Sequence, residues 1–265
     1  LFVHDRSLRL KWRRIMPENT GCVKLRLTGS GGRAKVGPVN HKAETTVLLA
    51  NGAYPVHAFP ADVLRSARRI VCCDGAADRL SQAGLEPAWV IGDLDSLSSA
   101  ARARWSDRLV AVSDPESNDL TKAFRFCVAR GWRDLAIVGA TGLREDHTLG
   151  NLSLLPDFAQ EAEVILLTDT GTFRPLLRSA RLRAHPGQQV SIFSFDPRTA
   201  ITSEGLRYPL RRLRLSRWWQ ATLNEASGDG FDLSFEGGPL LVYQTYGTRR
   251  SHAPGGTDEG KGVAT

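Results

Sequence analysis

Several features that define common protein classes are missing from this sequence. Only four cysteines occur, Cys22, Cys72, Cys73 and Cys127, and their spacing fits neither a disulfide framework nor a zinc site. Cys72 and Cys73 are adjacent in an apolar stretch and cannot both face one partner, so we expect buried thiols in a reducing cytoplasm. No apolar run reaches about 18 residues, so we expect neither a transmembrane helix nor a membrane partner.

A basic excess is also missing from most of the chain, although the net charge is +7. Residues 1–44 hold ten Lys/Arg and three Asp/Glu, whereas residues 45–265 hold 25 of each sign. The part that we expect to fold is therefore formally neutral, which argues against a nucleic-acid partner.

Both ends of the chain lack the periodicity of a folded segment. We expect residues 1–44 to be a basic, disordered extension. Upstream codons included by a misplaced start are one alternative, and a transit peptide is another, although Asp5 and Glu18 weaken the second. The only methionine is Met16. Residues 248–265 are rich in Gly, Arg and Ser, and we expect a disordered tail.

Between these ends the first pattern covers residues 45–172. Short apolar runs alternate there with segments of helical spacing, which predicts an α/β domain with a mostly parallel sheet and helices on both faces. The predicted strands are 45–50, 69–73, 89–91, 108–112, 135–138 and 164–168. The predicted helices are 61–68, 76–83, 98–105, 120–130 and 147–159.

The second pattern covers residues 173–247. Helical periodicity is weak, and short strand patterns are separated by Gly, Pro and Asp, which predicts a smaller antiparallel β-sandwich domain. The predicted strands are 188–195, 200–203, 205–210, 231–236 and 239–245.

Acidic residues follow the predicted strands of the first domain. Asp74 follows strand 69–73, Asp93 and Asp95 follow strand 89–91, and Asp119 precedes helix 120–130 with Glu116 three residues upstream. Acids at these strand ends gather at one edge of a parallel sheet, where open α/β folds bind ligands. Clustered carboxylates repel one another and need a cation, and their hard oxygen atoms favour Mg²⁺ that bridges to substrate phosphates. We therefore predict phosphoryl-type chemistry on a metal-bound nucleotide.

Each of these groups also has a purely structural interpretation. Asp93 and Asp95 could form a turn and a helix N-cap. Asn118 or Asp119 could cap the helix that follows, and Lys122 could be solvated. Several acidic sites at the same sheet edge are less easily explained in this way.

A glycine loop between a predicted strand and a predicted helix offers a phosphate site. Gly139 and Gly142 would let backbone N–H groups surround phosphate oxygens, and Arg144 could neutralise phosphate charge. His147 and Asn151 lie one turn apart on the helix that follows. The structural alternative is a helix cap and a surface arginine.

Two adjacent tryptophans, Trp218 and Trp219, precede Asn224 in the second domain. In a strand they would point to opposite faces, so at most one could line a given pocket. One interpretation is a stacking wall for a flat, cationic ligand. The other is core packing for one tryptophan and an interface for its neighbour.

Together these strings resemble the motifs of the thiamine pyrophosphokinase (thiamine diphosphokinase) family over roughly residues 45–247. The matching strings are Asp74-Gly75-Ala76-Ala77; Asp93-Leu94-Asp95-Ser96; Pro115-Glu116-Ser117-Asn118-Asp119 with Lys122-Ala123; Gly142-Leu143-Arg144-Glu145-Asp146-His147 with Asn151; Thr202-Ser203-Glu204-Gly205-Leu206-Arg207-Tyr208-Pro209-Leu210; and Leu223-Asn224-Glu225. Compared with the family motifs, Glu116 replaces an aspartate, Asn118 a threonine, Leu143 a glycine and Leu223 a serine. Leucine at position 143 disfavours a positive φ there.

The resemblance implies Mg²⁺-dependent transfer of pyrophosphate from ATP to the hydroxyl of thiamine, giving thiamine diphosphate and AMP. It also implies a cytoplasmic homodimer whose β domains help to build the thiamine site. The implied metal ligands are Asp74, Asp93, Asp95 and Glu116. The implied nucleotide-binding residues are Asn51, Gly52, Asp74, Gly75, Ser96, Lys122, Arg144, His147 and Asn151. The implied thiamine-binding residues are Glu116, Asp119, Asp146, Trp218, Trp219 and Asn224, and the implied catalytic residues are Asp93, Asp95, Asp119 and Asp146.

Two other functions are alternatives at this point. The string around Asp93 and Asp95 loosely resembles the nucleophile motif of haloacid dehalogenase-type phosphatases, but that motif follows the first strand, whereas here the acidic strand end at Asp74 precedes it. A non-catalytic relative that binds thiamine or a nucleotide is the second alternative, and Leu143 and Leu223 support it.

Overall fold

A computed structural model of the protein describes residues 34–36 and 45–248. Of the predicted basic extension, only strand β1 (Ala34–Val36) is described, and the sequence pattern did not predict it. The rest of that extension, Cys22 and the predicted tail beyond residue 248 lie outside the described residues. Among the described residues, no helix combines the length and the apolar character needed to span a membrane.

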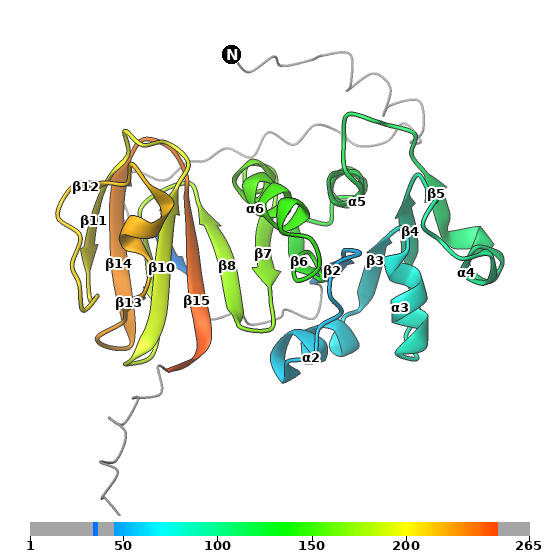
Figure 1. The fold of residues 1–265 in the computed structure, drawn as a ribbon, viewed down its shortest axis with the longest axis horizontal. Helices are drawn as coiled ribbons and strands as arrows, with labels where there is room; N and C mark the ends of the chain where they lie inside the picture. The colour runs from blue at the N-terminus through cyan, green and yellow to red at the C-terminus, as the bar shows by residue number, and fades with distance from the viewer. Residues whose placement is uncertain (1–33, 37–44, 249–265) are drawn as a thin grey trace, which may run out of the picture. The chain divides into compact units, whose positions relative to one another are not determined.

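The first part of the described chain alternates strands with helices (Figure 1). The strands are β2 (Thr46–Leu49), β3 (Arg69–Cys73), β4 (Trp89–Gly92), β5 (Leu109–Ala111), β6 (Asp134–Val138) and β7 (Glu163–Leu167). The helices are α2 (Ala58–Ser66), α3 (Ala76–Gln82), α4 (Ser99–Arg104), α5 (Asp119–Ala129) and α6 (Glu145–Phe158), and the 3₁₀ turn η1 (Ser106–Arg108) precedes β5. The predicted helices and strands of this part are confirmed, with each boundary shifted by at most three residues.

Side-chain caps begin α2, α4 and α5, and two of them come from a serine and an asparagine. Ser98 Oγ accepts a hydrogen bond from the backbone N–H of Ala101 (3.1 Å) at the start of α4. Asn118 Oδ1 accepts from the backbone N–H of Thr121 (2.9 Å) at the start of α5. Each bond satisfies a helical N–H that has no partner inside the helix. The structural interpretation of Asn118 as a cap is therefore confirmed.

Six strands form a parallel array in the order β5-β4-β3-β2-β6-β7. The chain moves outward from β2 to β5 and then returns to the other side of β2 with β6. Because such crossovers are right-handed, the helices change faces at this return. Figure 1 shows α2 and α3 on one side of the strands and α5 and α6 on the other. The carboxyl ends of β2 and β6 therefore flank a topological switch point, where open α/β sheets bind ligands.

Both faces of this array are buried, which explains why its strands are nearly continuous apolar runs. Val47 and Cys72 pack with Leu64 of α2 and Leu80 of α3 in one core cluster. On the other face, α5 and α6 are joined by the stacked rings of Phe124 and Phe158, whose centroids are 3.9 Å apart.

The second part of the described chain is built of strands. These are β8 (Gly171–Leu176), β9 (Ala180–Arg183), β10 (Gln188–Ser194), β11 (Ala200–Glu204), β12 (Leu213–Arg214), β13 (Asn224–Glu225), β14 (Gly230–Glu236) and β15 (Leu240–Thr248), with the 3₁₀ turn η2 (Trp218–Ala221) before β13. Strands β8, β15, β10 and β13 extend the parallel array through antiparallel pairs into a ten-stranded sheet. The other sheet has the order β1-β9-β14-β11-β12.

The two sheets of this part pack face to face around a second core. Val190 and Val242 of the large sheet share this core with Ile201 and Phe231 of the small one. The predicted antiparallel β-sandwich is therefore confirmed. One of its sheets continues directly from the parallel array, so the two parts of the chain share a ten-stranded sheet.

The predicted strand at residues 205–210 is wrong. Gly205 has a φ of 81°, and Leu206 forms only an isolated bridge with Ala226. Pro209 has no N–H for a strand ladder, and the backbone of Tyr208 donates to and accepts from the Asn224 side chain. The segment is therefore a loop between β11 and β12.

Candidate active site

Loops at the carboxyl ends of the parallel strands meet at the switch point. The loop after β2 lies against the loop after β6, because the Gly52 N–H donates to Gly139 O (2.6 Å) and the Ala53 N–H donates to Thr141 O (2.8 Å). A Cβ on Gly52 would lie 2.4 Å from Gly139 O and 2.7 Å from Thr141 O. Only glycine allows two backbones to approach this closely.

Three carboxylates converge in the loops after β3 and β4. Asp74, Asp93 and Asp95 each offer an oxygen atom, and these atoms lie within 4.8 Å of one another. Asp74 is buried, whereas Asp93 and Asp95 are exposed. A Cβ on Gly92 would lie 3.0 Å from the Cβ of Asp74 and 3.3 Å from the Cγ of Asp119. The four predicted aspartates therefore gather at one place, and we call Asp74, Asp93, Asp95 and Asp119 the acid cluster.

The surroundings of Asp74 fit a cation shared by the acid cluster. Asp74 Oδ2 accepts a hydrogen bond from the Ser96 N–H (3.1 Å), but buried Oδ1 has no hydrogen-bond partner among the described residues. Burial raises the pKa of Asp74 to about 6 against the opposing effect of the Ser96 N–H, and the charges of Asp119 and Asp93 add to the rise. A buried, unsatisfied oxygen atom beside further carboxylates is costly without a cation, and hard oxygen donors suit Mg²⁺.

Asp74 also has a strained backbone, with a φ of 43°. A non-glycine residue in the left-handed region is uncommon, although aspartate is among the residues that tolerate it best. Strain of this kind persists only where the surrounding structure imposes it, and it concentrates at functional sites.

Lys122 is buried against the acid cluster rather than solvated. Its Nζ donates to Asp119 Oδ1 (2.8 Å) and lies 3.6 Å from Asp93 Oδ2. Burial alone would lower the pKa of Lys122, but Asp119 and Asp93 raise it above its usual value. Burial alone would likewise raise the pKa of Asp93, but the Asp95 N–H and the Lys122 ammonium hold it below its usual value. Lys122 therefore supplies part of the positive charge that the clustered acids require.

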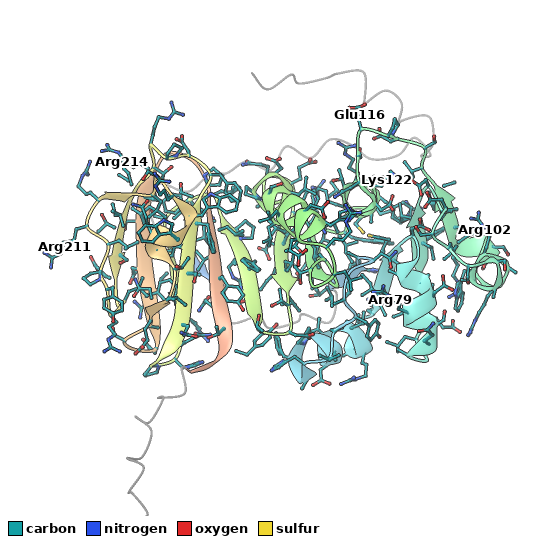
Figure 2. All side chains as sticks on the ribbon, viewed as in Figure 1. Arg79, Arg102, Glu116, Lys122, Arg211 and Arg214 are labelled. Atoms are coloured by element: carbon teal, nitrogen blue, oxygen red, sulfur yellow. The ribbon has the colours of Figure 1, made fainter. Side chains whose placement is uncertain are left out.

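Glu116 lies apart from these groups. Its backbone N–H donates to Asp114 Oδ1 (3.1 Å) in the loop between β5 and α5, and its side chain is exposed. Figure 2 shows Glu116 at the tip of this loop and Lys122 nearer to the sheet. Within the described part of the chain, the group of three carboxylates does not include Glu116. Its role in metal binding stays a prediction.

The glycine loop after β6 is connected by hydrogen bonds to α6 and, through it, to the start of α5. Its positive φ values fall on Gly139 (70°) and Gly142 (89°) and not on Leu143, so a leucine at position 143 is accommodated. Asn151 Nδ2 donates to Ala140 O (2.9 Å), and Asn118 Nδ2 donates to Asn151 Oδ1 (3.1 Å). Asn151 of α6 therefore links the glycine loop to the start of α5.

Arg144 and Asp146 form an exposed ion pair at the start of α6. Arg144 Nε lies 3.1 Å from Asp146 Oδ1, and Arg144 Nη2 lies 2.5 Å from Asp146 Oδ2. The hydrogen bonds from Arg144, together with one from the backbone N–H of His147, lower the pKa of Asp146 to about 2. A phosphate ligand at this edge would compete with Asp146 for the guanidinium.

The tryptophan pair lies elsewhere in the chain. Trp218 and Trp219 belong to η2, so their prediction as strand residues with opposite faces is wrong. They are 47% and 70% exposed, and Trp218 packs edge-on against Phe193 of β10 with ring centroids 6.1 Å apart. Strand β10 is six positions from β3 in the large sheet, which is about 29 Å at the usual strand spacing. In a single chain the tryptophans and the acid cluster are therefore far apart.

Asn224, which follows the tryptophan pair, holds the loop between β11 and β12 in place. Asn224 is buried; its Nδ2 donates to Tyr208 O (2.7 Å), and its Oδ1 accepts from the N–H groups of Tyr208 (3.1 Å) and Glu225 (2.8 Å). This bonding favours a positioning role for Asn224. Leu223 is 66% exposed and has a φ of 57°.

Two arginines that the sequence did not single out contact the site loops. Arg79 of α3 donates to Gly52 O, and Arg102 of α4 donates to Leu94 O (both are labelled in Figure 2). The sequence offers little signal for either residue, because arginines are common on the surfaces of helices. The carbonyl that each one reaches depends on how the helix packs.

Two family models match this chain. One is described as "Thiamin pyrophosphokinase, catalytic domain" and matches residues 61–167. The other is described as "Thiamin pyrophosphokinase, substrate-binding domain" and matches residues 171–243. Together they cover more than half of the chain. The first includes the acid cluster, and the second includes the tryptophan pair.

Individual relatives agree with the family models. The chain is 26% identical over 145 residues to a thiamine pyrophosphokinase of Bacillus subtilis, which covers 52% of this chain and 68% of that protein. The solved thiamin pyrophosphokinase from Candida albicans is 16% identical, with a TM-score of 0.67 and coverage of 80% of this chain and 93% of that chain. A thiamin pyrophosphokinase family protein from Enterococcus faecalis is 22% identical, with a TM-score of 0.66 and coverage of 77% and 100%. The two solved structures share the fold of this chain.

Proposed function

This chain belongs to the thiamin pyrophosphokinase family, and we propose that it transfers the pyrophosphoryl group of ATP to the hydroxyl of thiamine, giving thiamine diphosphate and AMP. The observation that carries the proposal is the convergence of three carboxylates within 4.8 Å at the carboxyl edge of the parallel strands, with Lys122 and Asp119 beside them. This edge is where the fold brings loops together for a ligand.

We assign Asp74, Asp93 and Asp95 as the residues that would hold Mg²⁺. A bound Mg²⁺ would offset the charge of the triphosphate and of the departing AMP. Lys122 keeps Asp119 and Asp93 in place through its two close contacts. Asp119, which borders this group, would orient the acceptor hydroxyl.

The phosphate groups of ATP would lie among the loops of the switch point. Arg144 would exchange its contact with Asp146 for phosphate oxygens, which leaves Asp146 available to the acceptor. The other proposed nucleotide-binding residues are Asn51, Gly52, Gly75, Ser96, His147 and Asn151. The transfer forms a bond from the thiamine oxygen to the β-phosphorus, breaks the bond from that phosphorus to the oxygen of AMP, and releases the hydroxyl proton. Positioning and charge stabilisation would supply most of the rate.

The thiamine wall would come from a second copy of the chain. Trp218 and Trp219 are exposed, and about 29 Å separates β10, against which Trp218 packs, from β3, which Asp74 follows. A homodimer in which the tryptophans of one subunit face the acid cluster of the other would bring the two groups close together. Stacking of the flat, cationic rings of thiamine on indole would then supply affinity.

A cytoplasmic location is also part of the proposal. In the described part of the chain, Cys72, Cys73 and Cys127 are free and buried. Burial raises the pKa values of their thiols, which keeps them protonated and unreactive. Such thiols suit a reducing compartment.

The two alternative functions are not favoured. Both family models are those of thiamin pyrophosphokinase, and the DxD string follows β4 rather than the first strand of the sheet. The support that Leu143 lent to a non-catalytic binder is weakened, because the positive φ values of the loop fall on Gly139 and Gly142 and not on Leu143.

Product analysis tests the proposed reaction. With purified protein, ATP, Mg²⁺ and thiamine, we expect AMP and thiamine diphosphate in equal amounts, measured by chromatography. ADP with thiamine monophosphate would show transfer of a single phosphoryl group instead. Phosphate release without thiamine would favour a phosphatase, and tight thiamine binding without AMP would favour a non-catalytic binder.

Subunit mixing tests the shared site. We expect Asp95→Asn and the double variant Trp218→Ala/Trp219→Ala each to be weakly active alone. Unfolded and refolded together, they should recover about a quarter of wild-type activity, because half of randomly assembled dimers would carry one intact site. A monomer in sedimentation experiments, or a mixture no more active than its parts, would contradict the shared site.

A further inference from the structure

The loop that carries Asp93 and Asp95 is anchored by the residue between them. Leu94 is only 4% exposed and belongs to the core cluster shared by α2 and α3. Its φ of 68° lies in the left-handed region, which is uncommon for a leucine. This conformation sends the leucine side chain into the core while the two flanking aspartates stay at the surface. The spacing of the aspartates therefore depends on what holds Leu94 in this conformation.

The Arg102 guanidinium holds the backbone of the loop at Leu94. Arg102 of α4, which is labelled in Figure 2, donates from Nη2 to Leu94 O. Leu94 O belongs to the peptide bond that joins Leu94 to Asp95. The bond from Arg102 therefore acts on the peptide that separates the two exposed acids of the cluster.

The position of Arg102 is itself well defined. Ser98, which caps α4, is held by Asp78 of α3 through its backbone N–H (3.0 Å to Oδ2) and its hydroxyl, which donates to Oδ1. Buried Trp105, at the end of α4, donates from Nε1 to Ser81 Oγ of α3 (3.2 Å). Both ends of α4 are thus bonded to α3, which holds in place the backbone from which the exposed Arg102 side chain extends.

Arg104, on the same helix as Arg102, contacts different groups. Its side chain is exposed, lies 3.7 Å from Glu86 and covers the ring of Trp105. Among the described residues, Arg104 forms no hydrogen bond or ion pair with the loop of the acid cluster, so the two arginines share a helix and a charge but contact different groups.

We propose that Arg102 is a positioning residue for the divalent cation: by holding Leu94 O it sets the spacing of the Asp93 and Asp95 carboxylates and thereby the affinity of the acid cluster for the cation. This inference rests on the proposed function, because the cation belongs to that function. Groups that orient metal ligands without touching the metal commonly change metal affinity by about 10–100-fold when they are removed.

Binding of Mn²⁺, measured by electron paramagnetic resonance on nucleotide-free protein, tests the proposal without any turnover. We expect Arg102→Met to weaken Mn²⁺ binding by about tenfold and Arg102→Lys, which keeps one donor and the charge, to recover part of the affinity. Arg104→Met should bind Mn²⁺ like the wild type. In assays, Arg102→Met should need more Mg²⁺ for half-maximal rate and regain most of its kcat when Mg²⁺ is saturating.

The outcomes separate the inference from the function on which it rests. If the wild type binds Mn²⁺ and Arg102→Met binds it equally well, the positioning role is overturned and the proposed function stands. A wild type that binds no Mn²⁺ would overturn both the cation site and this inference. If Arg102→Met does not fold, Arg102→Gln takes its place, and a several-fold loss of affinity with an unchanged melting temperature is the supporting result.

Discussion

Replacing Asp95 with asparagine is expected to lower turnover by at least about 100-fold while the fold survives. Asp95 is exposed, and asparagine has the same size, so the change opens no cavity and leaves no buried charge unpaired. It removes one of the three carboxylate charges that would hold the cation against the triphosphate. Loss of one charge aimed at the transferring group typically costs a factor of about 100 to 1,000 in rate. Steady-state assays with saturating ATP and thiamine measure the effect, and circular dichroism checks the fold.

The matched control for this variant is Asp157→Asn. Asp157 lies on the exposed side of α6, and the same chemical change there should leave turnover at the wild-type level. Near-normal turnover of Asp95→Asn would remove Asp95 from the metal-binding role. The cation would then have to depend on Asp74 and Asp93 alone.

A methyl group at position 52 is expected to disrupt the switch point. In Gly52→Ala the new Cβ would lie 2.4 Å from Gly139 O and 2.7 Å from Thr141 O, and both neighbours are backbone atoms that cannot rotate away. The loop after β2 would have to move and would weaken its hydrogen bond to Gly139. Overpacking of this kind costs about 1–3 kcal/mol, and each kcal/mol lowers the melting temperature by about 2–4 °C in a chain of this size. We also expect ATP to bind more weakly, as measured by calorimetry.

Gly150→Ala is the control for glycine replacement itself. Gly150 lies within α6, and a Cβ there would meet no atom within 4 Å. Alanine is the better helix former by about 1 kcal/mol, so this variant should keep or raise the melting temperature. A Gly52→Ala protein that melts like the wild type would show that the two loops separate at little cost. The close approach of the loops would then not explain why residue 52 is glycine.

The first half of the fold could be predicted because its signals are local. Apolar runs such as residues 69–73 are buried on both faces and end at Asp74, and a cap such as Asn118 begins the next helix. Parallel strands bring their carboxyl ends to one edge, so the gathering of the four aspartates could be predicted from their places after the strands and at the start of a helix.

The second half was harder to predict because its elements depend on partners far away in the chain. Strand β8 contains Pro175 and begins at Gly171, both of which argue against a strand in isolation. It forms because β15, about 70 residues later, supplies a full antiparallel partner. Residues 205–210 were predicted as a strand from a short strand pattern, but bonding between buried Asn224 and Tyr208 holds them as a loop. Trp218 was likewise considered in a strand, but it lies in the 3₁₀ turn η2.

The amino-acid sequence alone determined the α/β architecture, the acids at the strand ends and the family motifs, because these depend on residue type and spacing along the chain. Tertiary structure alone decided which groups neutralise and align those acids. Lys122 lies 3.6 Å from Asp93, and Arg102 reaches Leu94 O, only because α5 and α4 pack beside the loop after β4. The distance from the tryptophan pair to the acid cluster is likewise a property of the ten-stranded sheet, since strand order rather than strand sequence sets how far apart two loops lie.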